Sequence, residues 1–113
     1  MLVQPLPKTS YKKARKKREP PLFLLGYCYR CYREYGLKRL HGLERHHIYG
    51  GNPDRQHSDD YGLYIDLCHD CHLIVTDEKD SEFIAHLKKE GQRRFEARHT
   101  RQEFYDIFKI YYL

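Results

Sequence analysis

Apolar and polar residues alternate from Leu63 to Leu67, a pattern that is typical of a half-buried β-strand. A second strand is predicted over residues 43–48, which end in two adjacent histidines and an isoleucine. Residues 50–54 contain two glycines, an asparagine and a proline, so they predict a loop, and we expect Arg55 and Ser58 to lie in the same loop. These stretches predict an antiparallel pair of strands.

After the second strand the pattern becomes helical. One helix is predicted to begin near His69 and to run through Val75. Asp80 or Ser81 can cap a second helix, and Thr100 with Glu103 three residues later forms a capping box for a third. The apolar positions of the last two helices, which we assign to the core together with His86 and His99, are Phe83, Ile84, Leu87, Phe95, Phe104, Ile107, Phe108 and Tyr111.

The segment before the first strand is less regular. Residues 22–25 are a short apolar run that should pack on the domain, and residues 27–31 have the form of a zinc knuckle. Residues 32–40 fit either a short helix or a loop broken at Gly36, and the pattern does not decide between them. Together the elements predict a small α+β domain over residues 21–113, with a ββα core followed by two C-terminal helices.

The first 20 residues differ from the rest in charge. Residues 8–18 hold seven basic and no acidic side chains, whereas the whole chain has a net charge of +5, so the remaining positions are slightly negative. We expect residues 1–20 to be a flexible arm that contacts the phosphates of nucleic acid, the alternative being a solubilising tail. The predicted contacts are made by Lys12, Lys13, Arg15, Lys16, Lys17 and Arg18.

The chain has no apolar run of about 18 residues, so no membrane partner is predicted. Its first residues also lack the hydrophobic segment of a signal peptide, and we expect a cytoplasmic protein. In a reducing compartment, two Cys-x-x-Cys pairs favour zinc over disulfides, and a secreted protein with two disulfides is the alternative. Four thiolates leave no open position on the metal, so this zinc is predicted to be structural. Its ligands would be Cys28, Cys31, Cys68 and Cys71.

Three histidines are candidates for chemistry. His46 and His47 are adjacent, and neighbouring residues of a strand point to opposite faces, so one is expected to bind a metal while the other stays free as a base. A metal held by one of them and His72 would polarise a phosphate. Arg55 could contact the same phosphate or stabilise its own loop. The alternative for the histidines is that they are ordinary surface residues.

The pattern Cys28-x2-Cys31, His46-His47-Ile48 and Leu67-Cys68-x2-Cys71-His72 resembles the HNH endonucleases over residues 27–78. That resemblance implies a zinc-stapled ββα-metal core and DNA as the partner. It also implies that His46 and His72 bind one catalytic divalent metal (Mg²⁺, Mn²⁺, Ni²⁺ or Zn²⁺), and that His47 is the catalytic base.

Two positions depart from the family pattern. Leu63 stands where the family usually has its middle asparagine, which chiefly braces the loop, and Thr76 stands where a further histidine is expected one helical turn after His72. A third metal ligand could come from Thr76, Asp77 or Asp80, or from water.

A further set of residues is similar to small phage-encoded HNH-like proteins, some of them linked to recombination. This similarity implies the host cytoplasm as the location and phage or host recombination proteins as partners. The residues that carry it are Gly50, Gly51, Arg55, Ser58, Tyr61, Gly62, Leu63, Glu90, Gly91 and Gln92.

The sequence thus supports the hypothesis of a metal-dependent endonuclease that hydrolyses DNA phosphodiester bonds with His47 as the base. The missing asparagine and helical histidine motivate an alternative, a catalytically decayed, zinc-stabilised module that binds nucleic acid. A third hypothesis is a protein–protein adaptor built on the aromatic C-terminal helices.

Overall fold

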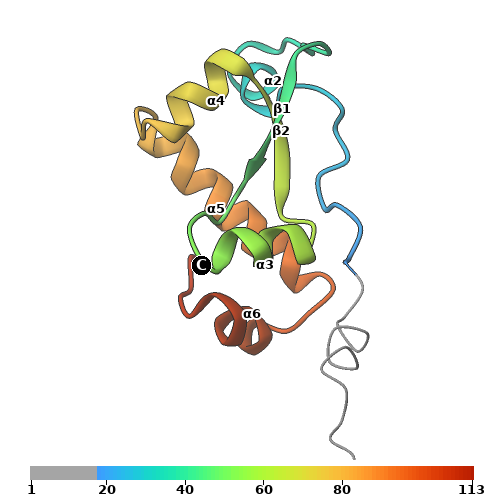
Figure 1. Cartoon of the computed structure of the whole chain (residues 1–113), viewed down its shortest axis with the longest axis vertical. Coiled ribbons are helices and arrows are strands. Elements are labelled where there is room, and N and C mark those ends of the chain that lie inside the picture. The colour runs from blue at the N-terminus through green and yellow to red at the C-terminus, as the bar shows by residue number, and fades with distance from the viewer. Residues whose placement is uncertain (1–17) are drawn as a thin grey trace, which may run out of the picture.

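The computed structural model describes residues 18–113, which form two strands and five helices (Figure 1). Strands β1 (Leu43–His47) and β2 (Tyr64–Cys68) are antiparallel, with Leu43 opposite Cys68 and His47 opposite Tyr64. Both predicted strands and the predicted α+β class are therefore confirmed.

Of the predicted basic arm, Arg18 is described and lies 3.4 Å from the Asp60 carboxylate, whereas Lys12, Lys13, Arg15, Lys16 and Lys17 lie outside the described residues.

Three helices follow the sheet as predicted. They are α4 (His69–Thr76), α5 (Ser81–Glu96) and α6 (Arg101–Phe108). Asp80 caps α5 by accepting a hydrogen bond from the Phe83 amide, and the capping box of Thr100 and Glu103 is formed at the start of α6. Tyr111 lies outside α6, contrary to the prediction, because Lys109 takes a left-handed conformation (φ 63°) that ends the helix.

The undecided segment after the first cysteine pair is partly helical. Helix α2 (Tyr29–Tyr35) begins inside the knuckle and ends at Gly36, whose φ of 68° is readily adopted by glycine. Figure 1 shows α2 and α4 at one end of the sheet and α3 and α6 toward the other, with α5 running along its side. The sheet thus connects the cysteine-bearing end to a mostly aromatic core.

The loop predicted around Arg55 and Ser58 is wrong, because both residues lie on helix α3 (Asp54–Asp60). This helix has no apolar stripe, since all seven of its residues are polar. Only Ser58 is buried, and it contacts the protein through hydrogen bonds rather than apolar packing. The sequence of α3 therefore has no hydrophobic periodicity from which a helix could be predicted.

The core lies between the sheet and helices α5 and α6. Phe83, Phe95, Phe104 and Phe108 are buried as predicted, and the ring of Tyr49 contacts those of Phe104 and Phe108 at centroid distances of 5.5 and 4.6 Å. Tyr49 also donates a hydrogen bond of 2.6 Å to the Lys88 carbonyl of α5. Tyr49, two positions after the end of β1, is therefore anchored in the aromatic core.

None of the helices within residues 18–113 has the length and apolar character needed to cross a membrane.

Candidate functional site

The four cysteines, far apart in the sequence, meet at the end of the sheet. Cys28 caps α2, Cys31 lies in its first turn, Cys68 ends β2 and Cys71 lies in α4. All four are buried, and their sulfurs lie within 4.8 Å of one another, with 3.8 Å from Cys31 to Cys68 and 3.6 Å from Cys31 to Cys71. Tetrahedral zinc with bonds of about 2.3 Å places its sulfurs about 3.8 Å apart, so this group could hold a metal ion.

The surroundings of the cluster favour a bound cation. Burial raises the pKa of the Cys31 thiol far above its usual value, and the hydrogen bonds with the neighbouring sulfurs raise it further. Four buried thiolates repel one another, and a divalent cation among them would offset that repulsion. The Cys31 amide also points at the Cys28 sulfur over 3.5 Å, a contact that favours negative charge on the sulfur.

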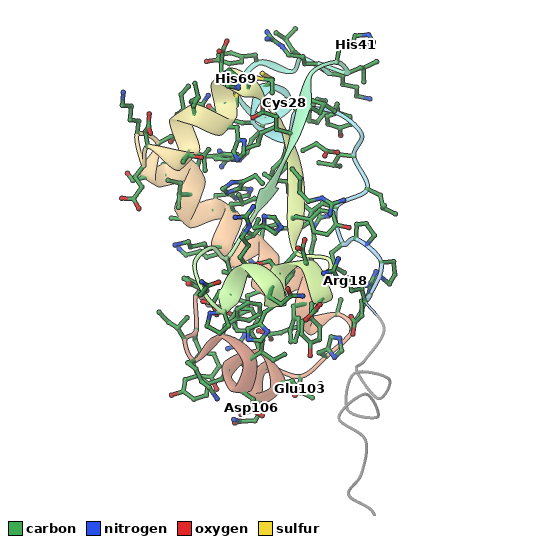
Figure 2. The ribbon with its side chains drawn as sticks, viewed as in Figure 1. Arg18, Cys28, His41, His69, Glu103 and Asp106 are labelled. Atoms are coloured by element: carbon green, nitrogen blue, oxygen red, sulfur yellow. The ribbon has the colours of Figure 1, made fainter. Side chains whose placement is uncertain are left out.

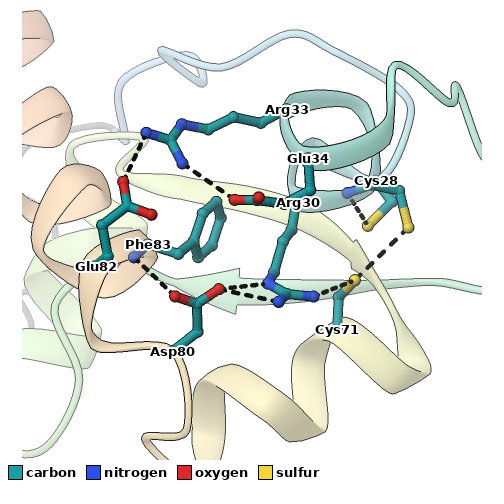
Figure 3. A network of polar contacts seen from close by, with 9 residues as sticks. Cys28, Arg30, Arg33, Glu34, Cys71, Asp80, Glu82 and Phe83 are labelled. Atoms are coloured by element: carbon teal, nitrogen blue, oxygen red, sulfur yellow. Dashed lines mark hydrogen bonds and ion pairs between the residues drawn. The ribbon is translucent and has the colours of Figure 1, made fainter.

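Arg30 connects the cysteine cluster to helix α5 (Figure 3). Its Nη1 donates to the Cys71 sulfur at 3.5 Å, while Nε and Nη2 donate to Asp80 at 3.0 and 2.9 Å. Asp80 is the residue that caps α5, so one guanidinium group contacts both the cluster and the start of that helix. Its side chain is only 13% exposed, which shields these contacts from solvent.

One face of β1 brings a histidine close to a histidine of α4. Glu44 and His46, two positions apart on the strand, share this face, and the centroid of the His46 ring lies 5.4 Å from that of the His72 ring. The Glu44 carboxylate contacts His72 Nδ1 at 2.8 Å and His69 Nδ1 at 2.9 Å, and these hydrogen bonds lower the pKa of Glu44. Since an ionised carboxylate only accepts, the His72 tautomer that fits this contact donates from Nδ1 and has its lone pair on Nε2, where it could bind a metal.

His46 is suited to the same ligand role. Burial, together with the nearby His72, His47 and Lys88, lowers the pKa of His46 to about 4, so its imidazole is neutral at pH 7. Within residues 18–113, however, the four cysteines are the only group of three or more metal-binding side chains that lie close enough to share one ion. Asp80 is held by Arg30, and Asp77 is an exposed residue at the end of α4.

His47 lies on the other face of β1, as strand geometry predicts. Its Nε2 is 2.8 Å from Oδ1 of Asp59 on α3, and Arg45 Nη1 is 3.7 Å from the same oxygen. An ionised Asp59 accepts from Nε2–H, which leaves the lone pair of a neutral His47 on Nδ1. Asp59 thus holds the ring in one tautomer and orientation.

Although they start on opposite faces, His46 and His47 line one pocket of about 340 Å³ at the end of β1. Lys88 of α5 brings a positive charge to this pocket, and Glu78 brings a carboxylate. The other lining residues are Ile48, Gly50, Val75, Thr76 and Ile84. The Lys88 ammonium and the neutral His46 imidazole could donate hydrogen bonds to an anionic group such as a phosphate.

Arg55 is not among the residues that line this pocket. It is exposed on α3, where its amide donates to the Gly51 carbonyl at 2.8 Å. The site instead includes Glu44, Asp59 and Lys88, which sequence reasoning missed. Asp59 and Lys88 reach the site from other elements, and Glu44, although it lies on β1, is marked only by its contacts with His69 and His72 of α4.

Ser58 fixes the segment that follows the two histidines. Its hydroxyl donates to the Tyr49 carbonyl at 2.8 Å and accepts from the Tyr49 amide at 3.2 Å, and both residues are buried. The Leu63 amide donates to the Ser58 carbonyl at 2.8 Å. One serine therefore holds α3, the end of β1 and the start of β2 together.

Replacing Ser58 by alanine is expected to lower the free energy of unfolding by about 1–3 kcal/mol, because it leaves the buried Tyr49 amide and carbonyl without this partner. Urea denaturation would show a lower midpoint with an unchanged slope. Ser81→Ala is the matched control, since Ser81 is exposed at the first position of α5. Equal midpoints for the two variants would contradict the role given to Ser58.

Comparison of the chain with protein-family models, with curated proteins and with solved structures gave no match.

Proposed function

We propose that this chain is a metal-dependent endonuclease of the HNH type, with β1, β2 and α4 as its ββα-metal core, and that it hydrolyses phosphodiester bonds in DNA. One observation carries the proposal: His46 and His47 line a single pocket, while His46 also lies beside His72 and His47 is held by Asp59. A candidate ligand pair and a candidate base thus come together from β1 and α4.

Zinc is the metal that we propose for the four-cysteine cluster. Four sulfurs that lie within 4.8 Å of one another suit its size and its preference for soft ligands. The cluster has no position left for a substrate, so its role would be structural. It lies at the start of α4, the helix that carries His72, and would fix that helix against the sheet.

His46 and His72 would hold the second metal, a divalent cation that supplies Lewis-acid polarisation of a phosphate. His47 would take a proton on Nδ1 from a water molecule while the water oxygen bonds to phosphorus and the bond to the leaving oxygen breaks. Asp59, hydrogen-bonded to Nε2, would stabilise the imidazolium that results. Lys88 would offset negative charge on the phosphate.

The two departures from the HNH pattern differ in whether another residue takes over the missing role. Ser58 braces the segment after β1 with two hydrogen bonds to Tyr49, which is the role that the resemblance gives to the missing asparagine. For the missing helical histidine, no other His, Cys, Asp or Glu of the described part of the chain lies close enough to His46 and His72 to share one ion with them. That observation favours a second candidate function, a zinc-stabilised module that binds nucleic acid without cutting it.

A plasmid-nicking assay tests the proposal. The zinc-loaded protein, dialysed to remove loosely bound ions, is expected to convert supercoiled plasmid to open circles after Mg²⁺, Mn²⁺, Ni²⁺ or additional Zn²⁺ is supplied. His72→Ala should abolish this conversion, whereas His41→Ala, at an exposed histidine beyond the pocket, should not change it.

DNA binding is measured on the same samples by a gel-shift assay. If the wild-type protein binds the plasmid but leaves it intact with every one of the four metals, the nuclease proposal fails and the binding module is preferred.

A further inference from the structure

An exposed aromatic and basic surface lies at the cysteine-bearing end of the molecule, away from the histidine pocket. Every residue from Tyr32 to Gly42 is exposed, including four large apolar side chains that are between 43% and 65% exposed. Figure 2 shows this end of the molecule, where Cys28 and His41 are labelled. We name this surface the knuckle patch, and its members are Tyr32, Tyr35, Leu37, Lys38, Arg39 and Leu40.

The backbone of the knuckle patch is held in place although its side chains face solvent. The Gly36 amide donates to the Tyr32 carbonyl at 2.8 Å, the Leu37 amide donates to Cys31 at 3.3 Å, and the Cys28 amide donates to Arg39 at 3.0 Å. The buried cysteines therefore anchor both ends of the patch. Exposed apolar side chains on such a fixed frame are typical of a binding surface.

Aromatic rings gather on and beside the patch. Tyr32 and Tyr35 are three positions apart on α2 and so share one side of the helix. The Tyr32 ring also contacts the Tyr27 ring at 5.0 Å between centroids, and the Lys38 ammonium lies 5.5 and 5.6 Å from the two ring centres. The patch thus presents flat apolar faces with a positive charge beside them.

The patch carries positive charges that can pair with an anionic ligand. Arg33 on the same helix is neutralised by Glu34 and Glu82. By contrast, Lys38 and Arg39 form no ion pair with any carboxylate of residues 18–113. Glu34, the one acidic residue between positions 27 and 43, is the partner of Arg33. A ligand that fits must offer flat apolar groups and negative charge together.

We propose that the knuckle patch binds single-stranded nucleic acid, with unpaired bases stacked on Tyr32 and Tyr35 and phosphates beside Lys38 and Arg39. Stacking on aromatic rings combined with cations along the backbone is how proteins hold unpaired strands. In a duplex the faces of the bases are covered by their neighbours, so the rings would find nothing to stack on. An acidic peptide without aromatic residues would supply the charge but not the flat rings.

The segment that carries the patch leads into β1, the strand that carries His46 and His47. The inference concerns binding alone, so its success or failure does not depend on whether the pocket cuts.

The test compares three labelled ligands by fluorescence anisotropy: an oligodeoxythymidine, an abasic strand of the same length and a duplex of that length. The zinc-loaded wild-type chain is expected to bind the thymidine strand at least about fivefold more tightly than the abasic strand, because only the former can stack. The double variant Tyr32→Ala/Tyr35→Ala is expected to lose this preference and to keep its affinity for the abasic strand.

The matched control is Tyr105→Ala/Tyr111→Ala, which removes two tyrosines that are 41% and 43% exposed and contact each other far from the patch. It should keep the wild-type preference. Lys38→Gln/Arg39→Gln should weaken binding to both strands and lower the dependence of log Kd on log salt by about one for each charge. Circular dichroism and zinc content verify that each variant is folded.

Three results would overturn the inference. One is equal affinity of the wild type for the thymidine and abasic strands. Another is a base preference that survives in Tyr32→Ala/Tyr35→Ala. The third is a concentration-dependent dimer that this variant abolishes, without any base preference, which would make the patch a contact between two copies of the chain.

Discussion

Cys31→Ser is expected to unfold most of residues 18–113 at neutral pH, even in excess zinc. Cys31 is buried, and its sulfur lies within 3.8 Å of those of Cys68 and Cys71. Binding of structural zinc contributes on the order of 10 kcal/mol to folding, whereas the whole stability of a small domain is about 5–15 kcal/mol. The contact of Arg30 with α5 also depends on this cluster, because the same guanidinium donates to the Cys71 sulfur.

The measurement is far-ultraviolet circular dichroism during heating, with the zinc content determined on the same sample and a phosphine reductant present throughout. The wild type treated with a chelator should give the same unfolded spectrum as the variant. Returning zinc should restore the wild type but not Cys31→Ser. A variant that melts cooperatively with a native spectrum and no bound metal would show that the cluster is dispensable.

His47→Ala is expected to slow plasmid nicking by about 10²- to 10⁴-fold, because it removes the proposed base that accepts the proton from water. The rate constant for the loss of supercoiled plasmid, measured with enzyme in excess over DNA, reports this step directly. Zinc content and DNA affinity should stay at wild-type values, since the His47 ring is hydrogen-bonded to Asp59 and is remote from the cysteines.

Asp59→Asn separates the positioning role from the chemistry. An amide can still hydrogen-bond to His47 but cannot stabilise its protonated form by charge, so the loss of rate should be smaller than in His47→Ala. His41→Ala serves again as the exposed control. Unchanged nicking in His47→Ala would remove this residue from the mechanism.

The sequence pattern predicts those parts of the fold in which burial follows a regular period. Residues 63–67 alternate and form β2, and the apolar spacing of α5 and α6 places Phe83, Phe95, Phe104 and Phe108 in the core. The cysteine spacing likewise predicts a single cluster. In each case, a local pattern corresponds directly to one buried face or one set of ligands.

Helix α3 could not be predicted in the same way, because it has no apolar stripe and is connected to the rest by the hydrogen bonds of Ser58 and Asp59. The same holds for the partners of the histidines. Glu44 and His72 are 28 positions apart, and His47 and Asp59 are 12 apart, so only the folded chain brings them together. Polar contacts at such separations have no periodic signature in a single sequence.

The contacts of Arg30 are expected to couple the cysteine cluster to the histidine pocket. Loosening the cluster would free Arg30 from Cys71 and disturb Asp80, the residue that caps α5. Helix α5 carries Ile84 and Lys88 into the histidine pocket, so one guanidinium would connect the affinity of the cluster for a metal with the affinity of the pocket for a ligand. Because linkage between binding free energies is reciprocal, a ligand that binds beside Lys88 is expected to raise the equilibrium affinity of the cluster for its metal.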